Sequence, residues 1–415
     1  MSSGRPLPGD IVESRLPETQ APPPTTETAP QRRFSSSLTK PEEGPEEAYP
    51  ERQGPALKPL SSSATYFYTL SYLVFFSIFG TLARLGLQAL TFYPGAPVVT
   101  GVLWANVGGS LLMGFFLEDK NIFREEWGNP RKENENSISN PTDEESKRHK
   151  STKKTIPLYI GLTTGFCGSV TSFSSVIRDV FLALSNDLPN PSSPTSASAP
   201  NGGFSFMALV AVLLTEVALS LAALICGSHL ALALDHIHLP PTIPFRLTRR
   251  IIDPLFAFLA WGCWLGSIFL AIFPPSGKDA WRGRAVFAII FAPLGCLLRF
   301  YLSLFLNARI PHFPLGTFAV NIVGTIILAM CYDLQHVDGV GASVLVSCQV
   351  LQGVMDGFCG SATTVSTWVA ELNGLAKRLH AYMYGAMSAS VALAFFVIIT
   401  GSLRWTVGFV TPVCG

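Results

Sequence analysis

Apolar and polar positions are strongly segregated along this chain. Stretches of roughly twenty apolar residues, long enough to cross a bilayer as helices, fill residues 63–404, whereas residues 1–62 and 118–156 hold most of the charges. The pattern predicts nine membrane-spanning helices. They cover about residues 65–90, 97–117, 157–183, 204–232, 252–273, 283–306, 314–333, 341–370 and 380–403.

Composition supports an all-α polytopic membrane protein. Hydrophobic residues make up 48% of the chain and charged residues only 14%, with a mean hydropathy of +0.36, whereas soluble domains carry about 25% charged residues. The net charge of +1 gives no support for a nucleic-acid partner. Residues 1–62 are rich in Pro, Ser, Thr and Glu and lack apolar periodicity, so we expect a disordered cytoplasmic tail without a signal peptide.

Basic residues between the apolar segments predict the orientation of the chain. If the N-terminus is cytoplasmic, the charged insert 118–156 and the loop 233–251 lie inside, and both are rich in Lys or Arg. Only the loop 274–282 disagrees, because it contains Lys278 and Arg282. The other loops expected outside contain no Lys or Arg: 91–96, 184–203 and 334–340. The C-terminus is therefore predicted to be extracellular.

Motifs recur in the same order along the two halves of the chain. The first-helix segments GTLARLGLQAL and LGCLLRFYLS align Arg84 with Arg299, and the second-helix segments align Asn106 with Asn321, both 215 residues apart. Two GFCGS blocks follow, 192 residues apart, and the insert 118–156 accounts for the shorter spacing. The order predicts an internal duplication of a four-helix unit.

The helix at 252–273 matches neither four-helix unit. It makes the second unit start on the opposite side of the membrane, which predicts two inverted repeats related by a pseudo-two-fold axis. The predicted divisions are a first repeat 63–235, a linker 236–278 with the inverting helix, a second repeat 279–404 and a short C-terminal tail 405–415.

The glycine blocks GFCGSVTSFSS (165–175) and GFCGSATTVST (357–367) lie inside apolar segments. Glycine allows the backbone to leave helical geometry, and hydroxyl side chains follow each block, so we expect a helix break at membrane depth. Close helix packing through small residues is the alternative.

Four further polar positions and one acidic position lie within apolar helices. Asn106 and Asn321 are candidate pore-lining donors or interhelical hydrogen-bond partners. Arg84 and Arg299 are expected to carry the charge of a vestibule or to face the bundle interior, with snorkelling at a helix end as the alternative. Glu216 is either the partner of an arginine or a functional gate.

No pattern of catalytic or metal-binding residues is present. The eight cysteines lie in or beside apolar segments, match no zinc spacing and are interpreted as small hydrophobic residues that need no disulfide. The basic segment SKRHKSTKK (146–154) is expected to be a solvated cytoplasmic loop, with contact to anionic lipid as a second hypothesis. We therefore predict that the chain is not an enzyme.

The repeated motifs resemble those of the Fluc/FEX family of fluoride channels. The features are GxxxR in a first helix, N-x-x-G in a second and a GFCG block followed by hydroxyl residues in a third, all found twice. A fused pair with an inverting helix resembles the eukaryotic, typically fungal, fluoride exporters of the plasma membrane. The resemblance covers about residues 65–404 except for the insert.

The resemblance implies a structural Na⁺ and an anion path. The Na⁺ would be held at the pseudo-two-fold axis by the backbone carbonyls of Gly168, Thr171, Gly360 and Thr363. The path would be lined by Asn106, Asn321, Phe173, Trp368, Ser220, Tyr384, Ser388, Thr364 and Thr367.

The two copies depart from the family pattern in different ways. The first block has Phe173 and then Val176, whereas the second has Val365 and then Trp368. The family draws each pair of rings from both copies, so one path would contain Phe173 and Trp368, and the other only two valines. We expect one working pore and one degenerate pore.

These features predict a passive, selective fluoride channel. An inside-negative potential of about 100 mV is worth about 2.3 kcal/mol per charge, which suffices to export an anion. Fusion of the two repeats suggests a monomer. The alternatives are a proton-coupled anion transporter that uses Glu216, an intramembrane enzyme that uses Cys167 or Cys359, and a purely structural membrane protein.

Overall fold

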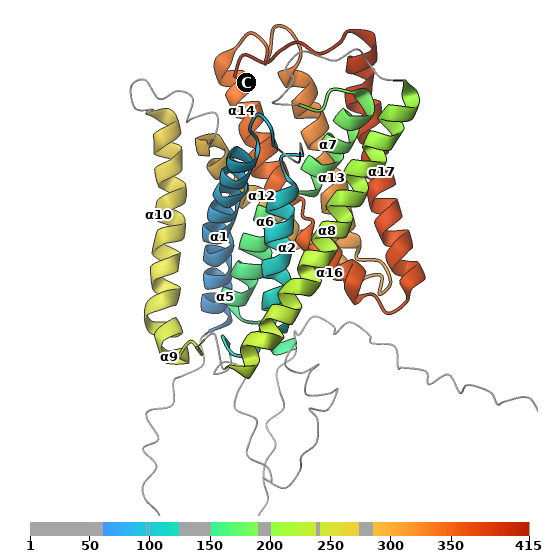
Figure 1. The fold of residues 1–415 in the computed structure, drawn as a ribbon. Coiled ribbons are helices and arrows are strands. Elements are labelled where there is room, and N and C mark those ends of the chain that lie inside the picture. The colour runs from blue at the N-terminus through green and yellow to red at the C-terminus, as the bar shows by residue number, and fades with distance from the viewer. Residues whose placement is uncertain are drawn as a thin grey trace, which may run out of the picture.

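The computed structural model describes residues 61–96, 98, 100–123, 151–189, 201–237, 241–273 and 285–414. This part of the chain forms helices, turns and coil, without a strand, and its long helices pack side by side in a bundle (Figure 1). The predicted all-α class is therefore confirmed. Almost all of the predicted N-terminal tail, and residues 124–150 of the insert, lie outside the described residues.

The first half of the bundle contains three long helices and one divided helix. The divided segment begins with α5 (Pro157–Ile160), continues through a π-helical stretch (Gly161–Cys167) into α6 (Gly168–Val170) and resumes as α7 (Phe173–Ser185). The other three are α1 (Ser62–Thr91), α2 (Leu103–Glu118) and α8 (Gly202–His236).

The second half has the same sequence of elements. Its divided segment comprises α14 (Leu345–Gly353), a π-helical stretch (Val354–Cys359), α15 (Gly360–Ala362) and α16 (Ser366–Gly374). Its long helices are α12 (Phe287–Leu306), α13 (Leu315–Gln335) and α17 (Arg378–Thr406). Between the halves lie α9 (Phe245–Leu247), a π-helical stretch (Thr248–Ile252) and α10 (Asp253–Ile272).

Seven helical segments of the described chain are long and apolar enough to cross a membrane. They are Ser62–Thr91, Pro157–Ser185, Gly202–His236, Phe245–Ile272, Phe287–Leu306, Leu315–Gln335 and Arg378–Thr406. Of the nine predicted spans, the second is only 16 residues long as α2, and the eighth is divided between α14 and α16. Nine spans therefore stay a prediction.

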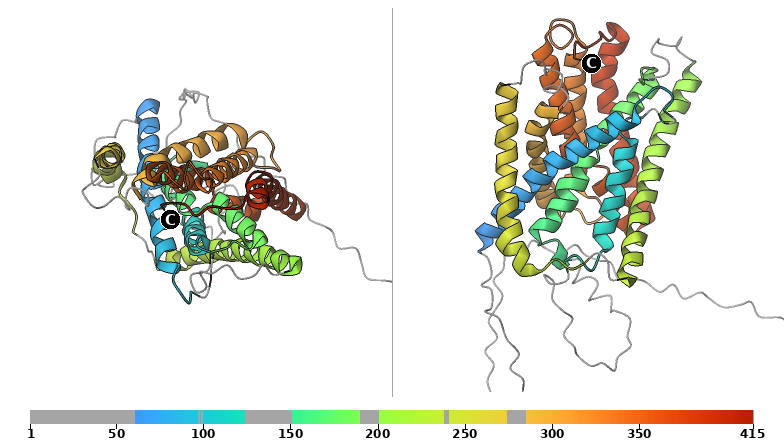
Figure 2. Two further views of the ribbon diagram at one scale, coloured as in Figure 1. Left: turned by 90° about the horizontal axis from the view of Figure 1, so that it is seen from above. Right: turned by 60° about the vertical axis from the view of Figure 1, so that its left-hand side comes forward.

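The linker helix α10 lies at the edge of the bundle, where it packs mainly against α1 (Figures 1 and 2). Two hydrogen bonds connect these helices: Tyr72 donates to Asp253 over 2.7 Å, and the Trp261 indole donates to Ser71 over 3.1 Å. The rings of Phe75 and Phe256 meet edge-on with their centroids 4.7 Å apart. The centre of the bundle is therefore left to the helices of the two halves.

The second part of each divided helix crosses into the other half of the molecule. Helix α7 packs against α8 of its own half and also against α13 and α17, whereas α16 packs against α17 and also against α2 and α8. The largest hydrophobic core lies along these crossings and contains Phe181 and Phe396, whose ring centroids are 5.2 Å apart. Both halves thus share one core.

One basic residue of the segment 146–154 does not fit the predicted solvated loop. Lys153 is only 1% exposed, and its ammonium group donates to the carbonyls of Phe116 (2.8 Å) and Asp119 at the C-terminal end of α2. These carbonyls have no helical donor and carry the negative end of the helix dipole, so a cation stabilises them. The end of the insert therefore fixes α2 in place.

Residues 407–414 fold back over the ends of α13 and α14. Cys414 forms a disulfide with Cys348 of α14, with the two Cα atoms 5.8 Å apart, and the Val410 amide donates to the His336 carbonyl over 3.1 Å. The prediction that no cysteine needs a disulfide is therefore wrong for this pair. The two cysteines are 66 residues apart, and only the return of the chain brings them together.

Replacing Cys414 with Ser should lower the free energy of unfolding by about 2–4 kcal/mol, because a cross-link that closes a long loop constrains the unfolded chain. Thermal unfolding of the purified protein in detergent measures the effect, and a reductant should produce the same shift in the unsubstituted protein. Cys226→Ser, at an exposed free cysteine of α8, is the control. Equal unfolding temperatures for both variants would contradict the assignment.

Candidate functional site

Both glycine blocks end in a break of the helix, as the sequence predicts. Thr171 follows α6 with φ −90° and ψ 149°, and Thr363 follows α15 with φ −87° and ψ 152°. These are extended conformations, so the backbone hydrogen bonds of a continuous helix are lost at both places. Each break lies in the buried interior, where lost hydrogen bonds must be replaced.

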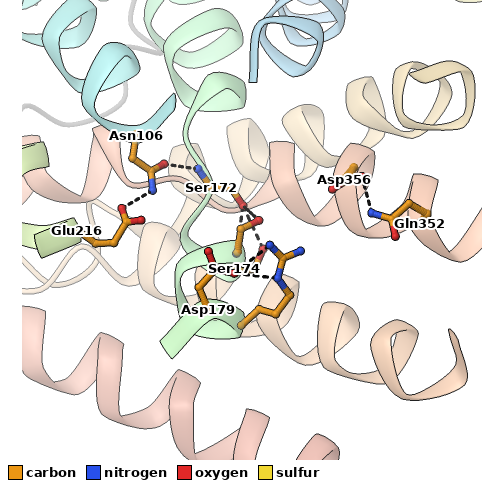
Figure 3. Close-up of polar contacts among 9 residues, drawn as sticks. Asn106, Ser172, Ser174, Asp179, Glu216, Gln352 and Asp356 are labelled. Carbon is orange, nitrogen blue, oxygen red and sulfur yellow. Dashed lines mark hydrogen bonds and ion pairs between the residues drawn. The ribbon is translucent and has the colours of Figure 1, made fainter. Parts of the chain in front are cut away.

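The two breaks bind each other through reciprocal hydrogen bonds. The Thr171 hydroxyl oxygen accepts the backbone N–H of Ser366 over 3.1 Å, and the Thr363 hydroxyl oxygen accepts the backbone N–H of Ser174 over 3.1 Å. Each pair is equivalent to the other under the 192-residue spacing of the blocks. Figure 3 shows Ser172 and Ser174 at this crossing. The breaks therefore form one shared polar centre.

The two repeated asparagines satisfy the amide groups that the breaks expose. The side-chain oxygen of Asn106 accepts the backbone N–H of Ser172 over 2.9 Å (Figure 3), and that of Asn321 accepts the backbone N–H of Thr364 over 2.9 Å. The amide nitrogen of Asn106 donates to Glu216 over 2.9 Å. Glu216 is thus the partner of an asparagine, not of an arginine, and the carbonyl end of each amide is already occupied.

Of the two expected places for Arg84 and Arg299, a vestibule or the bundle interior, the structure shows the interior, because they are only 1% and 2% exposed. Each guanidinium group crosses to the other half: Arg84 donates to the Asp356 carbonyl, and Arg299 donates to the Thr164 carbonyl over 2.6 Å. These two carbonyls are again equivalent under the 192-residue spacing. Arg84 therefore connects α1, and Arg299 connects α12, to the π-helical stretch of the opposite half, and neither side chain faces water.

Glycine leaves room where these arginines pass. A Cβ atom on Gly168 would lie 1.9 Å from Nη1 of Arg299, and one on Gly360 would lie 2.1 Å from Nη1 of Arg84. Such distances are far below van der Waals contact. The GFCG blocks thus carry a glycine where the guanidinium of the opposite half lies.

A small cavity lies between α7, α8 and α16. Its volume of ≈ 10 Å³ gives room for about one water-sized particle. The rings of Phe173 and Trp368 meet there nearly edge-on, at 69° with centroids 5.2 Å apart. The wall is formed by Phe173, Val176, Ile177, Leu213, Glu216, Val217, Val365 and Trp368. The aromatic pair and the two valines, expected in separate paths, therefore border one cavity.

The other predicted path residues are buried or half-buried near the same centre. The Tyr384 hydroxyl donates to Glu371 over 2.7 Å, and the Ser388 hydroxyl donates to the Tyr384 carbonyl over 2.7 Å. Ser220 is fully buried. The Thr364 hydroxyl bonds to the Thr171 hydroxyl over 3.1 Å and also accepts the backbone N–H of Thr367 over 3.4 Å.

Sequence reasoning missed Glu371, which holds Tyr384 in place. Its carboxylate also accepts hydrogen bonds from the Thr317 hydroxyl (2.7 Å) and the Asn307 amide (3.3 Å). A signal was available, because Asp179 is the acidic residue 192 positions earlier. Asp179 instead pairs with Arg178 over 3.0 Å.

The carbonyl groups at the crossing have the ligand type of a cation site. In a continuous helix the Gly168 and Gly360 carbonyls would accept N–H groups that here donate to the two asparagines. Neutral carbonyl oxygens suit hard cations such as Na⁺. The guanidinium groups beside both glycines disfavour any cation there, and most strongly one of higher charge. The carbonyl donor set therefore fits a monovalent cation better than a divalent one.

Comparison with known proteins identifies similar chains. A family model described as "CrcB-like protein, Camphor Resistance (CrcB)" matches residues 71–228 and 286–402. Fluoride export protein 1 of Neurospora crassa is 51% identical over 366 residues, covering 84% of this chain and 69% of the relative.

More distant relatives include a further fungal protein and a bacterial one. Fluoride export protein 1 of Candida albicans is 36% identical over 364 residues, covering 86% of this chain and 85% of the relative. The fluoride-specific ion channel FluC of Geotalea daltonii is 40% identical over 87 residues, covering 21% of this chain and 66% of the relative. No solved structure matches.

Replacing Gly109 with Ala should destabilise the protein by about 1–3 kcal/mol, because the new Cβ atom would lie 2.5 Å from the Thr171 methyl group. The neighbouring Gly108 is a matched control, since a Cβ atom there meets nothing within 4 Å. Gly108→Ala should be neutral or stabilise the helix by up to about 1 kcal/mol. Thermal unfolding in detergent distinguishes the two, and equal shifts would refute the packing described.

Proposed function

The chain belongs to the CrcB-like protein family, and from this membership we propose that it is a passive, selective fluoride channel with one conducting path. Its relatives are fluoride export proteins and a fluoride-specific ion channel. The resemblance to eukaryotic fluoride exporters expected from the motifs is thereby confirmed. The prediction that the chain is not an enzyme is also confirmed by the family.

The observation that carries the proposal is the aromatic pair at the cavity. Phe173 and Trp368 come from opposite halves and meet nearly edge-on where there is room for about one water-sized particle. Ring edges carry positive quadrupole character and attract an anion. Fluoride is small and strongly hydrated, so it passes only where protein groups replace its water.

Passive export needs only the membrane potential. An inside-negative potential of about 100 mV contributes about 2.3 kcal/mol per charge, or roughly a fifty-fold ratio of fluoride at equilibrium. Fluoride that enters as the neutral weak acid dissociates inside and leaves as the anion. The protein then has to provide selectivity and a path, not coupling.

In this proposal the second path is degenerate. The ring positions that the family pattern would assign to it are Val176 and Val365, which have no polarised ring edge and here border the same cavity as Phe173 and Trp368. Tyr384 and Ser388 are already engaged in hydrogen bonds within the protein. Without free donors or ring edges, this side offers little to replace the water around fluoride.

We further propose that the two halves are inverted repeats joined by α10. Support comes from the contacts that recur at the spacings of 215 and 192 residues: asparagine to break, arginine to opposite carbonyl and threonine to opposite serine. The family model also matches in two stretches that flank α10. The predicted divisions at 63–235, 236–278 and 279–404 follow from this arrangement.

A structural Na⁺ at the crossing is part of the proposal. The backbone carbonyls of Gly168, Thr171, Gly360 and Thr363 would hold it. When bound, the ion would compensate the carbonyl oxygens that the breaks leave without donors. The chain's own threonine and serine hydroxyls fix the two breaks against each other beside it.

We propose a plasma-membrane location with the N-terminus inside, the C-terminus outside and a single chain as the functional unit. The Cys348–Cys414 disulfide supports an extracellular C-terminus, because disulfides persist in oxidising compartments. The loops rich in Lys and Arg support a cytoplasmic N-terminus. The shared core of the two halves supports a monomer.

A proton-coupled transporter remains the second candidate, and one observation favours it. Glu216 is buried at the cavity, and its Oε1 atom has no hydrogen-bond partner among the described residues. Such a carboxyl group could carry a proton. Efflux from liposomes that follows an imposed pH gradient and ignores the membrane voltage would favour this candidate over the channel.

Replacing either Phe173 or Trp368 with Val should reduce fluoride efflux about tenfold or more. Each substitution removes a ring edge from the path, and a favourable aromatic contact of ~1.4 kcal/mol corresponds to a tenfold change. Efflux from liposomes, measured with a fluoride electrode and normalised to reconstituted protein, tests this.

Phe396→Val is the matched control for that experiment. Phe396 is fully buried and pairs with Phe181 at the same 5.2 Å ring separation, but it does not border the cavity. It should lose stability and keep its efflux per folded protein. Equal loss of efflux in the control and in the cavity variants would refute the proposed path.

Exchanging Na⁺ for K⁺ at constant ionic strength should lower the unfolding temperature by several degrees, since an ion that binds only the folded chain stabilises it. Differential scanning fluorimetry in detergent measures this. Identical unfolding temperatures in both salts would argue against the cation at the crossing.

A further inference from the structure

Four buried polar groups on one side of the crossing lack hydrogen-bond partners among the described residues. They are the hydroxyls of Ser110 and Ser220, the Oε1 atom of Glu216 and the indole nitrogen of Trp368. Leaving a buried polar group unpaired costs free energy, and such groups are rare in native proteins. Four of them in related positions call for a ligand.

The equivalent positions on the other side are satisfied or apolar. The Thr325 hydroxyl, 215 residues after Ser110, donates to the Asn321 carbonyl over 2.7 Å. Tyr384 and Ser388, equivalent to Glu216 and Ser220, donate to Glu371 and to the Tyr384 carbonyl, each over 2.7 Å. The first repeat has Val176 at the position equivalent to Trp368, and this valine borders the same cavity. Among the described residues, the hydroxyls at these equivalent positions are therefore satisfied internally in the second repeat and lack partners in the first.

The unpaired groups lie on α8 and α16, which border the cavity, and on α2, which packs against both. Ser110 lies one helical turn after Asn106 on α2, and Ser220 lies one turn after Glu216 on α8. Helices α2 and α8 pack against each other, and α16, which carries Trp368, packs on both. Glu216 and Trp368 themselves border the cavity. Asn106, with its amide nitrogen bonded to Glu216, joins the two helices.

Glu216 has no cationic partner among the described residues. Its hydrogen bond there is with an uncharged amide, and burial of an unpaired carboxylate is costly. The charged groups on the surrounding elements offer no counter-charge: Arg178 of α7 pairs with Asp179 at 3.0 Å, and the acidic residues of α2 and α16 are Glu118 and Glu371. The remaining neighbour charges are therefore negative.

We propose that Ser110, Glu216, Ser220 and Trp368 form a ladder of hydrogen-bond donors for dehydrated fluoride, with Glu216 acting as a carboxylic acid. The inference rests on the fluoride channel proposed above and assigns the groups that replace the water of the ion. Fluoride only accepts hydrogen bonds, so an O–H or N–H group must meet it at each step. A carboxylate would repel the ion, whereas the acid form donates.

Paired substitutions at the equivalent serine and threonine separate binding from stability. Ser110→Ala removes an unpaired hydroxyl, so the unfolding temperature should stay the same or rise while efflux falls about tenfold. Thr325→Val removes a paired hydroxyl, so the unfolding temperature should fall while efflux per folded protein is unchanged. The opposite pattern, or equal efflux in Ser110→Ala and the unsubstituted protein, overturns the ladder.

Two substitutions of Glu216 test its protonation state. Glu216→Leu removes the donor and should lower efflux about tenfold or more, whereas Glu216→Gln keeps a donor without a titratable proton and should retain clearly more efflux than Glu216→Leu. Raising the pH on both sides until the carboxyl group ionises should slow the unsubstituted channel and leave Glu216→Gln unaffected. Loss of efflux in Glu216→Gln would point to a proton carrier and overturn the donor role.

The outcomes also separate this inference from the proposed function. If the unsubstituted protein releases fluoride from liposomes but Ser110→Ala and Glu216→Leu do so equally fast, the ladder is refuted and the channel stands. If the unsubstituted protein releases no fluoride, both are refuted. Size-exclusion profiles of each variant establish that the compared proteins are folded. If Glu216→Leu aggregates, the efflux of Ser110→Ala alone decides whether the ladder is refuted.

Discussion

Backbone amides inside a bilayer must find hydrogen-bond partners within the protein, and this constraint organises the whole molecule. Two helices break at Thr171 and Thr363, and each break exposes an N–H group that a continuous helix would have satisfied. Asn106 and Asn321 accept these groups. The hydroxyls of each break satisfy the other, so neither half is complete alone. The position of α7 and α16, and hence of the cavity between them, follows from this exchange.

The two halves share one scaffold but differ in how their buried polar groups are satisfied. The hydroxyls of Tyr384 and Thr325 both donate to groups inside the protein, which favours stability. Around Glu216 and Ser110, several buried groups have no hydrogen-bond partner in the described part of the chain, which lowers stability unless a ligand pairs with them. Local sequence rules are often violated where a protein must bind something. The two copies have therefore diverged in how the polar groups at equivalent positions are satisfied.

Much of this was predictable from the duplicated motifs, because two copies of a pattern reveal which positions share a role. The membrane class, both helix breaks and the equivalence of Asn106 and Asn321 could be predicted in this way. The destinations of Arg84 and Arg299 did not, since a spacing cannot show that a long side chain crosses to the opposite half. The disulfide to Cys414 depends on the return of the chain, and the burial of Lys153 depends on the end of α2; neither leaves a periodic signal.

The arginine crossing also bears on how such a chain can be made. Gly168 is synthesised long before Arg299, whose guanidinium group occupies the space beside it, while Arg84 must wait for Gly360. The first four helices therefore leave the ribosome with an unfilled gap and an unplaced buried charge. Only when the last helices insert can both contacts close, so the assembly of this protein is a late and cooperative event. Truncation at the linker would leave a membrane-inserted half in which Arg84 lacks the Asp356 carbonyl and Gly168 lacks its guanidinium neighbour.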